Sequence, residues 1–476
     1  MPVPGVFLRS SLRGRLFSKT TAAGLLIGTS GVLYCLQTTK ALHLDVSSSD
    51  HPSRQPERLL KSTKSVHDVD AKLREHEQSY VVEETLSGIT RYDVSQVSSN
   101  FPSEDDHAEI IVPTPASHWS FFAVFDGHNG WETSHWLRSN LLPAVIGAMA
   151  DLFASCFRDA DTGGLRENVI PDPSPQDIDR VIKDTFIRID HDIVSEPLER
   201  VFATLSRETA MRLLAPAYAG SCALLGFYDS RTRLLRIALT GDSRAVLGRR
   251  VTDADGQVSY EVHVLSQDQN GYNESEVSRL AAEHPGETGL AKDGRVMGWG
   301  MCRAFGDARM KWSLDAQARL KEGYLGRTPY KNVLTPPYFT AEPVITTTAI
   351  QPGDFLILAT DGLWESISNA EAVGLVGTWL GDPKSPDMHT PEQLQSNYGP
   401  EDLPVPIQAD DTARYRQWNT KKRFSNGELN AATHLIRNAL GGADKDLTAA
   451  LLAINPPRSR TYRDDITAVV VFFDGA

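Results

Sequence analysis

Four apolar runs in this 476-residue chain each adjoin an acidic residue, and this pattern constrains the fold more than any other feature. The runs are WSFFAVFD (119–126), LLRIALTGD (234–242), DFLILATD (354–361) and DDITAVVVFF (464–473). Their β-branched and aromatic residues favour strands, and because nearly every position is apolar, each strand should be buried on both faces. The chain therefore needs sheets that are covered on both sides.

Helical periodicity separates these strands along the chain. Residues 221–228 add a strand, which a polar turn joins to the run at 234–242. Apolar residues recur at helical spacing in the stretches 131–157, 176–194, 274–283, 370–380 and 430–440. Strands joined by hairpins and divided by long helices predict an α+β fold in which helices cover packed sheets. Two further stretches, 312–340 and 381–425, are expected to be insertions.

The composition excludes several classes of protein. Hydrophobic residues make up 41% and charged residues 23% of the chain, as in an ordinary globular protein. The formal net charge of −13 argues against a nucleic-acid partner, because binding to phosphates requires clustered Lys and Arg. The cysteines at 35, 156, 222 and 302 lie far apart in the sequence, so we expect neither a disulfide framework nor a zinc site.

The N-terminal segment differs from the rest of the chain. Residues 1–19 are basic, rich in leucine and serine and free of acids, which is typical of a mitochondrial presequence. Residues 20–39 are uncharged and just long enough to span a bilayer core. A cleaved matrix presequence, a presequence with an inner-membrane anchor and a secretory signal are the three interpretations. We therefore expect a presequence over 1–40, a polar linker over 41–80 and a folded domain over 81–476.

The acidic residues at the strand ends are the candidate functional residues. Asp126, Asp242 and Asp361 follow their strands, whereas Asp464 and Asp465 precede theirs. If the last strand runs antiparallel to its neighbours, all these ends lie at one edge. Converging carboxylates repel one another, and divalent cations offset that cost. Oxygen ligands favour Mg²⁺ or Mn²⁺ over zinc or copper. One Asp-Gly alone is more often a turn, but the repetition favours a metal site.

A set of motifs, in order along the chain, resembles the metal-dependent PPM (type 2C) protein phosphatases. The matching strings include SEDD (103–106), FFAVFDGHNG (121–130), LTGDSRAVL (239–247), CRAFGD (302–307), ILATDGLWE (357–365) and YRDDITAVVVFF (462–473). The resemblance implies an αββα sandwich of two mainly antiparallel sheets flanked by helices. The strings NFPSEDD, MKW, TPPYFTAEP and YRDDIT are similar to the mitochondrial pyruvate dehydrogenase phosphatase branch of that family.

The resemblance also implies a role for each matching position. It implies two Mg²⁺ or Mn²⁺ ions, with the ligands Asp105, Asp126, the carbonyl of Gly127, Asp361 and Asp464. It implies a general acid, His128, next to the bridging ligand Asp126. The remaining acids would lie in an outer shell or hold a weakly bound third ion, and they are Glu104, Asp242, Glu365 and Asp465.

One position departs from the general family pattern. Many members carry an Arg four residues before the Glu of the SEDD-type motif, where it contacts the substrate phosphate. This chain has Asn100 at that position, as the pyruvate dehydrogenase phosphatases do. Phosphate binding is then expected to rely on the metal ions and on neutral donors such as Asn100.

The implied function is hydrolysis of phosphoserine and phosphothreonine by metal-activated water. The expected phosphoprotein substrate is the pyruvate dehydrogenase complex, which dephosphorylation would activate. The alternatives are a phosphatase of the same kind that acts on another protein in the intermembrane space, and a catalytically weak binding module. The expected location is mitochondrial, either in the matrix or associated with the inner membrane.

Overall fold

The computed structural model describes residues 66–83, 85–114, 117–156, 173–381, 397–406 and 409–474. The expected presequence over 1–40, including the uncharged segment 20–39, lies outside the described residues. The same holds for residues 382–396, which are part of the stretch 381–425 that the sequence marks as an insertion.

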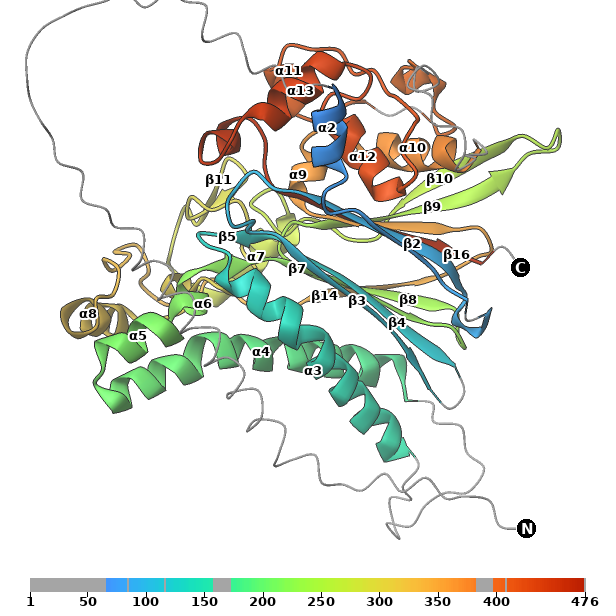
Figure 1. The fold of residues 1–476 in the computed structure, drawn as a ribbon. Helices are drawn as coiled ribbons and strands as arrows, with labels where there is room; N and C mark the ends of the chain where they lie inside the picture. The colour runs from blue at the N-terminus through green and yellow to red at the C-terminus, as the bar shows by residue number, and fades with distance from the viewer. Residues whose placement is uncertain are drawn as a thin grey trace, which may run out of the picture. The chain divides into compact units, whose positions relative to one another are not determined.

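Two antiparallel sheets form the centre of the fold (Figure 1). The six-stranded sheet has the order β1 (Gln78–Val81), β2 (Ile89–Val97), β16 (Ile466–Phe473), β15 (Phe355–Ala359), β9 (Arg244–Thr252) and β10 (Val258–Val264). The five-stranded sheet has the order β14 (Val344–Ala349), β8 (Leu234–Thr240), β7 (Ala223–Asp229), β4 (His118–Phe125) and β3 (Asp106–Pro113). Neighbouring strands within both sheets run antiparallel.

The strands are buried on both faces, as their continuous apolar runs predict. In β4, Phe122 and Val124 pack between the two sheets, whereas Trp119, Phe121, Ala123 and Phe125 pack against the helices. In β16, Val469, Val471 and Phe473 face the other sheet, whereas Ile466, Ala468, Val470 and Phe472 face helices on the opposite side. One core therefore lies between the sheets and one lies on each outer face, which confirms the predicted αββα sandwich.

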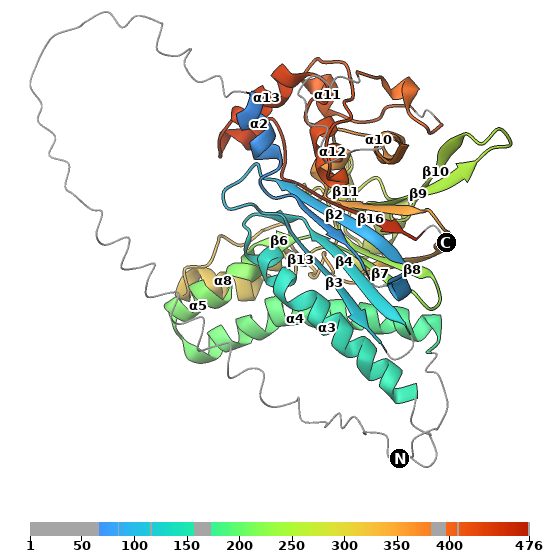
Figure 2. The ribbon, with the colours of Figure 1, turned by 45° about the vertical axis from the view of Figure 1, so that its right-hand side comes forward.

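Helices cover both outer faces of the sandwich (Figures 1 and 2). On the five-stranded side lie α3 (Glu132–Cys156), α4 (Pro175–Thr204), α5 (Arg207–Leu213), α6 (Ala215–Tyr218) and α8 (Leu314–Gly323). On the six-stranded side lie α2 (Val66–Leu73), α9 (Asp361–Trp364), α10 (Asn369–Gly381), α11 (Arg414–Gln417), α12 (Ala431–Ala439) and α13 (Lys445–Ala453). Helix α3 is long and apolar enough to cross a membrane, but its buried side chains belong to the core that it shares with α4.

The folded domain begins earlier in the chain than the sequence predicts. Helix α2 lies within the range 41–80, for which the sequence predicts a linker, and strand β1 begins within it. Leu73 is fully buried in the core beneath α12, and β1 pairs with β2. The C-terminal part of that predicted linker is therefore an integral part of the fold.

The expected insertion at 312–340 also contributes to the core. Trp312, Leu320 and Tyr324 are buried in the core that α3 and α4 share, and the indole of Trp312 donates a hydrogen bond to the carbonyl of Val194 in α4. This segment therefore supports the sheet that carries part of the candidate site.

Three short strands lie at the end of the sheets where the acidic residues gather. They are β5 (Gly127–His128), β6 (Gly220–Ser221) and β13 (Phe305–Gly306), in the order β13-β6-β5. Ser221 of the central strand β6 pairs with Gly127 of β5 on one side and with Phe305 of β13 on the other. This small sheet fixes the backbone on which His128 and Asp307 stand.

Candidate metal centre

The strand ends of both sheets bring carboxylates together. Asp126 follows β4 and Asp242 follows β8, both in the five-stranded sheet, and Asp361 follows β15 in the six-stranded sheet. Each offers an oxygen that lies within 4.8 Å of an oxygen of the other two. The antiparallel pairing of β15 with β16 also brings Asp464 and Asp465 to this edge. The sequence prediction that the strand ends converge is confirmed for these elements.

The chemistry of this cluster fits hard divalent cations. Burial, together with the charges of Asp361, Asp105 and Asp242, raises the pKa of the Asp126 carboxyl well above its ordinary value. Burial and the charge of Asp242 raise the pKa of Asp361 to about 8. The protein thus holds carboxylates where their own charges oppose ionisation, and a bound cation would remove that penalty. Asp242, for which the resemblance implies a weakly bound third ion or an outer-shell position, lies within the cluster itself.

Two glycines allow the ligand loops to approach one another closely. A Cβ at Gly127 would lie 2.1 Å from the backbone oxygen of Glu104, and a Cβ at Gly362 would lie 2.1 Å from the backbone oxygen of Asp465. Any side chain at either position would push the loops apart. Glycine therefore follows Asp126 and Asp361 because another backbone passes at that point.

Asp105 links the two sheets beneath the cluster. Its Oδ2 accepts hydrogen bonds from the hydroxyls of Thr360, at 2.9 Å, and Thr467, at 2.8 Å. Burial and the nearby Asp465 raise the pKa of Asp105 well above its ordinary value. The expected metal ligand is thus buried beside the centre, with one oxygen already held by two hydroxyl groups.

Asp465 organises the loop that carries Glu104. Its carboxylate accepts hydrogen bonds from the backbone N–H groups of Ser99, of Asn100 at 3.0 Å and of Glu104 at 2.9 Å. The carboxylate of Glu104 in turn accepts a hydrogen bond of 2.6 Å from the backbone N–H of Gly130. These contacts suit the outer-shell positions that the sequence assigned to both residues.

Two of the expected ligand positions are paired with arginines. Asp464 forms an ion pair with Arg460, one turn earlier in the chain. Glu365 accepts a 2.7 Å hydrogen bond from Nε of Arg414 and a second contact from the same guanidinium. In this structure, Arg414 therefore neutralises the charge of Glu365, and Arg460 neutralises that of Asp464.

Asn100 has its amide committed within the loop. Its Nδ2 donates to Glu104 Oε2 at 2.7 Å and to Asp465 Oδ2 at 3.3 Å. The expected phosphate donor is therefore occupied by two carboxylates in this structure.

His128 forms a buried pair with Asp307. The His128 Nε2 and Asp307 Oδ2 atoms are 2.5 Å apart, and Nδ1 has no hydrogen-bond partner among the described residues. Burial alone would lower the pKa of His128, but the charge and hydrogen bond of Asp307 outweigh it, and the pKa is raised. The family resemblance places Asp307, the last residue of the CRAFGD motif, in a polar turn near the site, but the sequence does not predict its pairing with His128.

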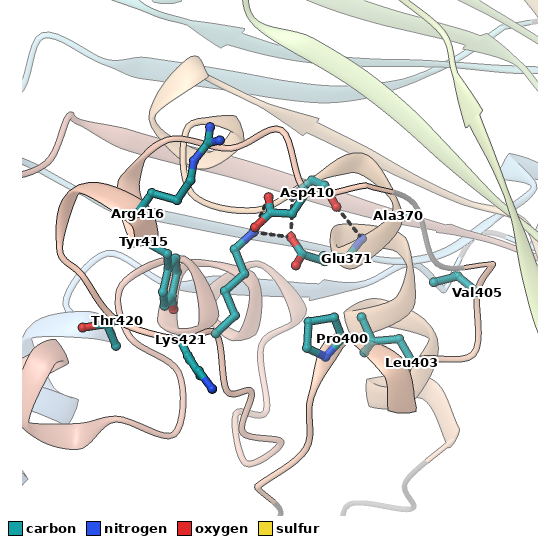
Figure 3. Close-up of a pocket in the computed structure, with 12 residues that line it drawn as sticks. Ala370, Glu371, Pro400, Leu403, Val405, Asp410, Tyr415, Arg416, Thr420 and Lys421 are labelled. Atoms are coloured by element: carbon teal, nitrogen blue, oxygen red, sulfur yellow. Dashed lines mark hydrogen bonds and ion pairs between the residues drawn. The ribbon is translucent and has the colours of Figure 1, made fainter.

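A separate cavity of about 270 Å³ lies beside α10 and α11 (Figure 3). Lys422 donates to Glu371 at 2.7 Å and to Asp410 at 2.9 Å at its edge, and Tyr415, Leu403 and other side chains form its walls. None of the strand-end carboxylates lines it. This cavity is therefore distinct from the candidate metal centre.

Comparisons with known proteins place this geometry in context. The family model described as protein phosphatase 2C matches residues 91–396. A protein phosphatase 2C homologue of Schizosaccharomyces pombe is 38% identical, over 98% of this chain and 99% of its own length. Mitochondrial pyruvate dehydrogenase phosphatase 1 is 35% identical in Saccharomyces cerevisiae, over 85% of this chain and 72% of that protein. The Homo sapiens protein of that name is 31% identical, over 85% of this chain and 82% of its own length.

Proposed function

This chain belongs to the protein phosphatase 2C family and is a metal-dependent protein serine/threonine phosphatase, and from that premise we propose that its substrate is the phosphorylated pyruvate dehydrogenase complex. Relatives that match over most of the chain are named pyruvate dehydrogenase phosphatases. The names of the same relatives support a mitochondrial location, which agrees with the basic, acid-free segment 1–19.

The proposed metal centre rests on one observation, the convergence of Asp126, Asp242 and Asp361 at strand ends within 4.8 Å of one another. We propose that the cluster, with Asp105, Asp464 and the carbonyl of Gly127, holds two Mg²⁺ or Mn²⁺ ions. Such ions would stabilise negative charge on the phosphoryl oxygens and make water acidic enough to attack at neutral pH. The carboxylates would orient these ions, and their oxygen ligands would bind them in preference to softer metals.

The proposed general acid is His128. Asp307 holds its Nε2 and raises the pKa of the ring, so that the imidazolium form persists at higher pH than in a free histidine. A protonated imidazole can donate to the serine or threonine oxygen as it leaves phosphorus. Asp307 is then a positioning residue, because it fixes the orientation and the charge of the ring without contacting the substrate.

Hydrolysis of the phosphorylated complex by the purified chain tests this function. Release of phosphate should require Mg²⁺ or Mn²⁺ and should stop in excess chelator. Asp126→Asn should lower turnover by orders of magnitude, because it removes a central ligand charge. An unrelated phosphoserine protein of similar size serves as the control substrate. Turnover in excess chelator would contradict the metal requirement, and equal rates on both substrates would contradict the proposed specificity.

A further inference from the structure

The cations that surround the carboxylate cluster are mostly committed to protein partners. Arg244 donates to Asp268 through Nε at 3.1 Å and Nη2 at 2.7 Å, and to Asn369 through Nη1 at 2.8 Å. Arg414 holds Glu365 with its Nε and Nη2. Three of the five N–H donors of Arg244 are used by these partners, and the charge of Arg414 is neutralised by Glu365, so protein acceptors already hold both guanidinium groups in place.

Arg460 differs from these two arginines in its exposure and in its contacts. It lies in a short 3-10 helix, Arg458–Thr461, one turn before Asp464, and its side chain is 41% exposed. Within the described part of the chain, its guanidinium pairs with the carboxylate of Asp464 alone. Since a guanidinium carries five N–H donors, most of its donors are available.

The position of Arg460 also brings its charge into the site. Burial raises the pKa of the Glu104 and Asp361 carboxyls, and the positive charge of Arg460 opposes this rise in both. Arg460 thus lies close to acids from two different loops of the cluster. Because the Arg460 side chain is partly exposed and pairs with Asp464, an anion in solvent can reach its guanidinium beside the cluster.

Asn100, the uncharged candidate for the phosphate contact, is already hydrogen-bonded to protein carboxylates. The amide nitrogen of Asn100 already donates to Glu104 and Asp465, and its remaining Oδ1 atom is an acceptor, which repels a phosphate oxygen. A planar guanidinium, in contrast, matches two phosphate oxygens at once and keeps its charge at all working pH values.

We propose that Arg460 contacts the phosphoryl oxygens of the substrate and supplies the charged phosphate contact that Asn100 cannot supply. The proposal deepens the phosphatase function above and rests on it. Cations held by the carboxylates would take over the neutralisation of Asp464, which would leave the guanidinium of Arg460 for the phosphoryl group.

Calorimetric titration of the full chain with inorganic phosphate, in saturating Mg²⁺, tests this assignment without a measurement of turnover. Arg460→Gln should weaken phosphate binding by about tenfold to a hundredfold, the range for a hydrogen-bonded contact to a charged group. Mg²⁺ binding, titrated separately, should be unchanged or tighter, because a competitor for Asp464 has been removed. With p-nitrophenyl phosphate, KM should rise more than kcat falls.

Two further variants control for folding and for charge. Arg458→Gln removes an exposed arginine of the same short helix, which lies over the ring of Tyr462, and it should bind phosphate like the parent chain. Arg460→Lys keeps the positive charge but loses the planar fork, and it should give an intermediate affinity.

Unchanged phosphate affinity in folded Arg460→Gln overturns the proposal. A parallel loss of Mg²⁺ affinity also overturns it, because Arg460 would then act only by positioning Asp464. Failure of the proposed function has a different signature, namely a parent chain that binds phosphate through Arg460 but hydrolyses no phosphoprotein in Mg²⁺.

Discussion

Replacement of Asp361 by asparagine should stabilise the metal-free protein while it abolishes the metal site. The carboxyl of Asp361 has its pKa raised from 3.8 to about 8, by burial first and then by the charges of Asp242 and Glu365. The folded protein therefore binds more protons than the unfolded chain between those values. Its stability falls as the pH rises through this window, because the carboxylate ionises more readily in the unfolded chain.

The magnitude follows from two estimates. A shift of this size, at about 1.4 kcal/mol per pKa unit, sets an upper limit of about 6 kcal/mol. Two unit charges at the 4.8 Å limit of the cluster repel by about 3 kcal/mol at an effective dielectric constant of about 20. We expect Asp361→Asn to gain about 2–4 kcal/mol at pH 8. For a folded unit of this size, that raises Tm by about 2–5 °C.

Thermal unfolding in excess chelator, at pH 5 and at pH 8, measures this effect. The gain should shrink at pH 5, where the native carboxyl of Asp361 is already protonated and resembles an amide. Asp255→Asn, in the exposed turn between β9 and β10, is the control and should give no gain at either pH. Added Mg²⁺ should raise the Tm of the parent chain more than that of the variant. A gain that is equal at both pH values, or a loss at pH 8, would contradict the attribution of the gain to the raised pKa of Asp361.

The remaining predictions concern the pair at His128, the cavity and the N-terminal segment. Asp307→Asn should move the alkaline limb of the kcat–pH profile to lower pH, because His128 loses the carboxylate whose charge and hydrogen bond raise its pKa; an unshifted limb would argue against the histidine as the general acid. Lys422→Met should cost about 3–5 kcal/mol in denaturant unfolding, since the buried carboxylate of Glu371 loses its ion-pair partner, whereas the exposed neighbour Lys421 should tolerate the same change. A similar loss for both lysines would contradict this. Deletion of residues 1–39 should leave an active phosphatase that mitochondria do not import, and import of the truncated chain would falsify the presequence assignment.

The elements that the sequence predicts well are those with one dominant physical signal. The apolar run at 119–126 corresponds to β4, and the helical periodicity at 274–283 corresponds to α7 (Glu274–Glu283). Both patterns reflect which side chains are buried, and the order of apolar and polar residues in the sequence shows this directly. The sequence does not predict helix α2, because it is short and half of its residues are polar or charged. The helix is held by its contacts with α12 and α13, which come from the far end of the chain.

The sequence predicts which acids gather at the strand ends of the candidate site, but not how the other side chains of the site pair. The strand-end position of Asp126 and Asp361 was visible in the sequence, because each acid directly follows an apolar run. The pairing of His128 with Asp307 joins residues that are 179 positions apart, and no local pattern encodes it. Only the small sheet of β5, β6 and β13 brings these two residues together.

The acids of the candidate metal centre come from both sheets of the sandwich, so the centre connects the two layers at one end. Asp126 and Asp242 belong to the five-stranded sheet and Asp361 to the six-stranded sheet, while Asp105 is held by hydroxyls across the same gap. In the proposed metal centre, affinity for a cation and the spacing of the layers would therefore be one linked equilibrium. A substitution between the layers, far from any ligand, would then alter the affinity for the ion, and loss of the ion would loosen the layers at that end first.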